Sequence, residues 1–115
     1  MDYETAYQLL ITQGNALFKP ESEDDFLRRL QQGKPPIPGQ VTAILLALKI
    51  VFEALHDAKT IQRELALAVY VLTMESQRLF EAGRKSQVDW PPLLKEDLYR
   101  ISLAVQSLFS GVWQT

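Results

Sequence analysis

Apolar residues along this chain recur three and four positions apart, and they nowhere alternate regularly with polar residues over the length of a strand. Spacings of three and four place residues on one face of an α-helix. Regular alternation of apolar and polar residues would be expected of a half-buried β-strand. No Asn-Gly or Asp-Gly pair marks a hairpin turn. We therefore predict an all-α fold, a compact bundle of four to five helices in a single domain over residues 1–115.

Start and stop residues divide the pattern into five segments. We expect helices over residues 3–18, 23–32, 40–56, 61–82 and from 91 or 92 to 111. Ser, Thr and Asp accept backbone N–H groups at helix N-caps, and Gly follows helix C-termini in the left-handed conformation. The predicted N-caps are Asp2, Ser22 and Thr60. The glycines predicted to end helices are Gly33, Gly83 and Gly111.

The segment 40–56 is apolar nearly all round, which is typical of a helix that other helices surround. We therefore expect it to be the central helix of the bundle. Its remaining polar side chains form a thin stripe, made by Thr42, Lys49, Glu53 and His56. The last helix has a packing seam with spacings of four, three, four and three. The seam residues are Leu94, Leu98, Ile101, Val105 and Leu108.

Composition narrows the class of protein. A chain of 115 residues with 47% hydrophobic and 23% charged residues can bury one core without cross-links. The net charge of −2 argues against an electrostatic nucleic-acid binder. The chain has no cysteine, which excludes disulfides and thiolate sites and fits a reducing compartment. The longest apolar run is shorter than the ~20 residues that span a bilayer, and the N-terminus lacks the positive charge of a secretory signal. We expect a cytoplasmic protein without membrane or nucleic-acid partners.

One pair of residues suggests metal chemistry. Glu53 and His56 form a Glu-x-x-His motif, which two helices of di-iron carboxylate bundles each contribute. His56 is the only histidine, so a second motif would have to come from a second copy of the chain. Further glutamate ligands would be Glu64 or Glu75. The alternative is that the pair forms the solvated edge of the helix 40–56, and we favour it.

Other catalytic patterns are missing. No serine lies in a G-x-S-x-G turn, and the acidic runs at 23–25 and 96–97 are explained by the helix dipole, which favours negative charge at helix starts. A phosphate loop needs backbone amides after its Gly-Lys pair, but Lys34 is followed by Pro35. We therefore expect no cofactor and no enzyme activity.

Binding features are better represented. Pro35 and Pro38 form a minimal P-x-x-P segment, which either docks in an aromatic groove or serves as a stiff connection between helices. Trp90 precedes two prolines and either packs the entry to the last helix or serves as an exposed anchor. Trp113 follows the last helix and either folds back onto the bundle or contacts a partner. We favour the packed alternative in all three cases and keep Trp113, Trp90, Pro35 and Pro38 as candidate partner-binding residues.

Three segments together resemble a family of small helical proteins of cyanobacteria: "PPIPGQVTAILLALKIVFEAL", "DWPPLLKEDL" and "AVQSLFSGVWQT". The resemblance implies a cyanobacterial source and no known activity, and it assigns no functional residue. Some members carry a dethiobiotin synthetase label. This sequence contradicts that label, because it lacks the required phosphate loop and is too short for the α/β fold of such an enzyme.

Two classes of function stay open. The first is a non-enzymatic interaction, assembly or regulatory module whose protein partner is unknown, with self-association through an apolar face as one form of it. The second is a small-ligand or metal-binding bundle that uses the stripe of Lys49, Glu53 and His56.

Overall fold

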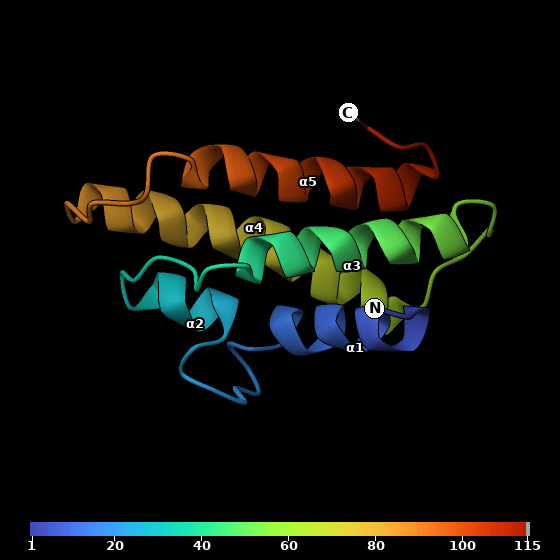
Figure 1. Cartoon of the computed structure of the whole chain (residues 1–115), viewed down its shortest axis with the longest axis horizontal. Helices are drawn as coiled ribbons and strands as arrows, with labels where there is room; N and C mark the ends of the chain where they lie inside the picture. The colour runs from blue at the N-terminus through green and yellow to red at the C-terminus, as the bar shows by residue number, and fades with distance from the viewer. Residues whose placement is uncertain (115) are drawn as a thin grey trace.

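The computed structural model describes residues 1–114, and over this range the chain forms five α-helices and no strand (Figure 1). The helices are α1 (Tyr3–Gly14), α2 (Phe26–Gln31), α3 (Gln40–Leu55), α4 (Arg63–Lys85) and α5 (Leu94–Ser110). The predicted all-α bundle is therefore confirmed. Within the described range, no helix combines the length and the apolar character needed to cross a membrane.

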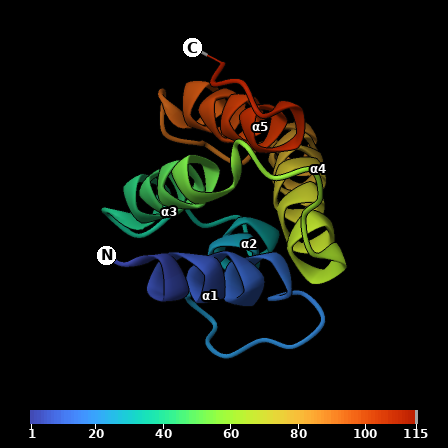
Figure 2. The same ribbon diagram turned by 90° about the vertical axis from the view of Figure 1, so that its right-hand side faces the viewer.

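The four longer helices form a ring. Helix α1 packs against α3 and α4, and α5 closes the other side by packing against the same two helices (Figure 2). The short α2 covers part of α4. The ring encloses one hydrophobic core, to which every helix contributes. The predicted seam of α5 is confirmed, since all five of its residues are buried.

Helix α3 is not enclosed on all sides. It contributes buried residues to the core and lies between α1 and α5, as Figure 2 shows. Its outward side, however, faces solvent, and Leu46 there is 47% exposed. The expectation that other helices surround α3 is therefore met on two sides only. Helix α4, which packs against α1, α2 and α5, has more helical neighbours.

Two of the three predicted N-caps are wrong. Asp2 caps α1 by accepting the Thr5 amide at 2.8 Å, and this hydrogen bond lowers the pKa of Asp2. Ser22 lies four residues before α2, which begins at Phe26. There the backbone amide of Phe26 donates to the side chain of Gln13 at 2.9 Å, so the cap comes from the preceding segment. Thr60 also lies outside a helix, because α4 begins at Arg63 with Gln62 as N-cap.

Of the three glycines predicted to end helices, two do so and one does not. Gly33 and Gly111 have φ of +73° and +76° and end helices in the left-handed conformation, as predicted. Gly83 does not end a helix, because α4 continues through it to Lys85. Gly14 ends α1 where this helix crosses α4 so closely that a Cβ atom would lie 2.4 Å from the Ala68 carbonyl oxygen. Only a residue without a side chain permits this crossing. The predicted end of this helix at residue 18 is wrong, because residues 15–18 form turns.

Candidate interaction surface

The predicted metal-binding pair lies on the surface. Glu53 and His56 are both exposed near the end of α3. Glu53 pairs with Lys49 at 3.9 Å, and the His56 Nδ1 atom lies 3.3 Å from the carboxylate of Asp57. Between residues 1 and 114, no three His, Cys, Asp or Glu side chains come together as a group that could hold a metal ion. The further predicted ligands, Glu64 and Glu75, lie on α4. There Glu64 accepts a hydrogen bond from Tyr7, and Glu75 pairs with Arg78.

Trp90 is docked on α4 instead of projecting into solvent. Its indole N–H donates to the backbone carbonyl of Phe80 at 3.0 Å, and its ring stacks on that of Phe80. The ring fills a notch over Gly83, where a Cβ atom would lie 2.4 Å from the indole. This explains why the glycine lies inside a helix. Trp90 fixes the loop that leads into α5, the packed alternative considered above.

Trp113 folds back onto α3. Its ring contacts Phe52 with a centroid distance of 5.1 Å, and the Lys49 ammonium lies 3.9 Å from the indole centroid. The backbone amide of Gln114 donates to Ser107 Oγ at 2.7 Å and holds the segment in place. Trp113 is therefore partly buried by contacts within the chain.

This folded segment closes a pocket between α3 and α5. The pocket has a volume of about 340 Å³, and its lining is mainly apolar, with Leu45, Leu103 and Trp113 among its residues. Two cationic side chains, Lys49 and Arg100, reach its edge. Lys49 is thus the one residue of the predicted polar stripe in the lining of this pocket. Glu53 and His56 are not part of its lining.

The proline segment is a corner between α2 and α3. Pro35 and Pro38 are exposed, and the carbonyl of Pro35 accepts a hydrogen bond from Arg29 Nε at 2.9 Å. Gln40 secures the far side, because its side chain accepts the amide of Ile37 and donates to the carbonyl of Asp24. The segment is held from both ends, as a stiff connection requires.

The start of α4 is attached to α1 through Tyr7. The Tyr7 hydroxyl donates to Glu64 at 3.0 Å and also contacts the side chain of Gln62. Desolvation, together with the hydrogen bond to Glu64 and its negative charge, raises the pKa of Tyr7 to about 12. The neutral phenol is therefore the form that this contact favours.

An apolar stripe on the outward side of α4 was not predicted from the sequence. Leu67, Tyr70 and Met74 are 56%, 53% and 50% exposed, although they are spaced like core residues. Across from them, Phe109 of α5 is also exposed. Between the two helices lies an almost wholly apolar groove of about 400 Å³, lined by Tyr70, Met74, Val105 and Phe109 among others.

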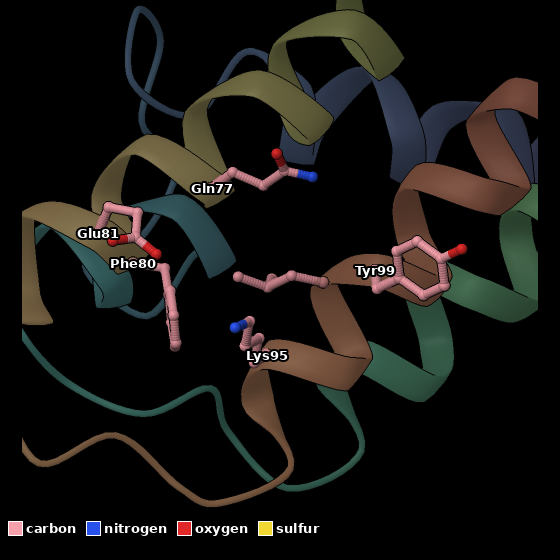
Figure 3. A pocket seen from close by; sticks show the side chains of 6 residues that line it. Gln77, Phe80, Glu81, Lys95 and Tyr99 are labelled. Carbon is pink, nitrogen blue, oxygen red and sulfur yellow. The ribbon is translucent and has the colours of Figure 1, made fainter.

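The depression between α4 and α5 continues towards the other end of the two helices. Figure 3 shows a second pocket there, with Gln77, Phe80 and Glu81 extending from α4 and Lys95 and Tyr99 from α5. Its volume is about 250 Å³. We call the outward side of α4 and the adjoining side of α5, with both pockets, the α4–α5 surface. Its middle is apolar, and charged residues lie at its ends.

Compared with known proteins, the chain matches no family model, no curated protein and no solved structure. The resemblance to small helical proteins of cyanobacteria therefore stays a prediction. What the chain does has to be inferred from its own surface.

Proposed function

We propose that this chain is a non-enzymatic interaction and assembly module that binds an amphipathic helix on its α4–α5 surface. The observation that carries the proposal is the exposed stripe of Leu67, Tyr70 and Met74. A large apolar side chain that lies alone on a surface is ordinary, but a row of them beside an apolar groove is typical of a binding face.

The shape of the surface selects the kind of partner. Two antiparallel helices with a depression between them accept a third helix, whose apolar residues enter at spacings of three and four. Tyr70 and Phe109 are aromatic walls for such residues, and aromatic side chains carry much of the binding energy in protein interfaces. Met74 adds an unbranched side chain that adapts to its partner.

The test is affinity capture from the native cell with wild type, Met74→Asp and Leu46→Asp. Leu46 is the matched control, because it is equally exposed and lies on α3, outside the α4–α5 surface. We expect a defined protein, including further copies of the chain itself, to be retained by wild type and Leu46→Asp and lost with Met74→Asp. Capture that is unchanged in Met74→Asp, or no bound protein with wild type, would contradict the proposal.

A second candidate function rests on the pocket between α3 and α5. We propose that it accepts a small aromatic carboxylate, because Lys49 and Arg100 supply positive charge at the edge of an apolar cavity. Trp113 would then stack on the ligand. The metal-binding form of this alternative lacks a comparable observation.

Calorimetric titration with phenylacetate tests this second candidate, with phenethylamine as the control of opposite charge. We expect binding of the acid only, weakened on the order of tenfold in Arg100→Gln, as expected for the loss of a charge-assisted hydrogen bond. No heat with the acid, or equal binding of the amine, would exclude this use of the pocket.

A further inference from the structure

We infer that the helix bound on the α4–α5 surface is α4 of a second copy of this chain, packed antiparallel about a two-fold axis. This inference rests on the proposed function and names its partner. The relevant residues form one row along α4, which we call the α4 seam. It consists of Arg63, Leu67, Tyr70, Met74, Gln77 and Glu81.

The spacing of the seam is symmetric. Successive members lie four, three, four, three and four residues apart, and this series reads the same in both directions. Alternating steps of four and three keep residues on one side of a helix that packs against another helix. An antiparallel copy therefore meets every seam residue with a seam residue, and the symmetry fixes the register. The two-fold axis passes between the two helices at the level of residue 72, midway between Tyr70 and Met74.

The charges at the two ends of the seam are complementary in this register. Arg63 at the start of α4 meets Glu81 of the partner subunit, and Glu81 meets the partner's Arg63. Eighteen residues separate the two, which is five full turns of an α-helix. A parallel arrangement would instead bring like charges together at each end.

The middle of the seam is where the dimer buries apolar surface. In this register, Tyr70 packs on the partner's Met74, and Leu67 packs on the aliphatic part of the partner's Gln77. Phe109 of α5 extends the contact, because it lines the same apolar groove as Tyr70 and Met74. All three large apolar residues of the seam, which are half exposed in the single chain, become covered in this way.

The other exposed apolar residues of the described chain offer no comparable face. Leu46 is the one large apolar side chain of α3 that is exposed, and Tyr99 of α5 already belongs to the α4–α5 surface. The remaining ones lie outside the helices: Met1, Phe18, Leu93 and Val112. None of them belongs to a row with opposite charges at its two ends. The α4 seam is therefore the face that fits a second copy.

A charge swap tests both the partner and the register. The mass of the purified full chain is measured by sedimentation equilibrium over a range of concentrations. We expect wild type to dimerise, and Arg63→Glu or Glu81→Arg alone to raise the dissociation constant on the order of tenfold. Each single change replaces two exposed attractions by two repulsions. The double variant Arg63→Glu/Glu81→Arg restores both pairs and should return the constant to nearly its wild-type value.

Arg100→Glu is the control, because this exposed cation of α5 lies outside the seam. Circular dichroism checks that each variant keeps its helices. A dimer that the double variant does not restore, or that Met74→Asp leaves intact, would overturn the antiparallel seam. If wild type stays monomeric but captures another protein through Met74, the partner is not a second copy of the chain. The proposed function would then still hold. A monomer that captures nothing would overturn both.

Discussion

The two sides of α4 carry similar residues and have different roles. On the inward side, Leu65, Val69 and Leu72 have no exposed surface. On the outward side, Leu67, Tyr70 and Met74 are each at least half exposed. Both rows have helical spacing and large apolar side chains. The first holds the bundle together, whereas the second is available for a partner.

The difference teaches that helical periodicity alone does not identify a core. A helix with one apolar row can be assigned an inward side from its sequence. A helix with two such rows cannot, because either row could face the core. In α4 the choice is made by neighbours: Gly14 of α1 contacts the inward side at Ala68, and no described part of the chain covers Met74. Substitutions on the two sides should therefore have separable effects.

The largest expected effect comes from removing a core side chain on the inward side. Leu72→Ala should lower the free energy of unfolding by about 2–5 kcal/mol, because it deletes buried methyl groups and leaves a cavity. Leu67→Ala on the outward side should change it by less than about 0.5 kcal/mol. Urea unfolding of both variants at a concentration where the chain is monomeric measures the contrast. Equal losses would show that the two sides are not distinct.

The next effect concerns the crossing of α1 and α4. Gly14→Ala should destabilise the bundle by about 2–3 kcal/mol, because the new methyl group overlaps the backbone of Ala68. Alanine would otherwise favour a helix over glycine by about 1 kcal/mol. Gln8→Ala, an exposed change on the same helix, is the control. An unchanged unfolding midpoint for Gly14→Ala would mean that the helices can separate without cost.

A smaller effect is expected where α4 receives Trp90. Gly83→Ala should cost about 1–2 kcal/mol, because the indole must move out of its notch and lose its bond to Phe80. In a Trp90→Leu background, the same change should be neutral or stabilising, since only helix propensity then remains. The difference between the two backgrounds isolates the contact. No coupling between the two positions would contradict this account of Gly83.

The smallest effect is a pH dependence at the contact between Tyr7 of α1 and the start of α4. The pKa of Tyr7 rises from 10.0 to about 12 on folding, so its contribution to stability is present below pH ~10 and is lost as the pH rises towards ~12. Tyr7→Phe should remove this part of the alkaline decline in stability. Tyr99→Phe, at an exposed position on α5, should not. The comparison uses unfolding midpoints measured at several pH values across this window.

The features that local sequence determines were predictable. Asp2 caps α1 through an amide three residues away, and the seam of α5 follows from its own spacing. The features that distant residues determine were not. The start of α2 depends on Gln13, and the place of Gly83 inside α4 depends on Trp90. Glycine occurs both at helix ends and at close contacts between helices and side chains. Because helix ends are the commoner case, Gly83 was predicted to follow the end of the helix, whereas α4 continues to Lys85.

The candidate interaction surface was not predicted for a related reason. The outward row of α4 is visible in the sequence as Leu67, Tyr70 and Met74, between the residues assigned to the core. Its role emerges only when the other helices are in place and leave it uncovered. The candidates predicted from the sequence were instead Trp90 and Trp113, because tryptophan is enriched in binding sites. Both indoles are engaged within the chain.

The two docked tryptophans also provide optical reporters for different parts of the molecule. Trp90 lies beside the end of α4, and Trp113 lies by the end of α3, towards the opposite end of the bundle (Figure 1). In a variant that keeps only Trp113, fluorescence quenching by acrylamide would report release of the C-terminal segment while the helices remain folded. A variant that keeps only Trp90 would report loosening of the loop before α5. Local opening at each end could thus be timed separately from unfolding of the whole bundle.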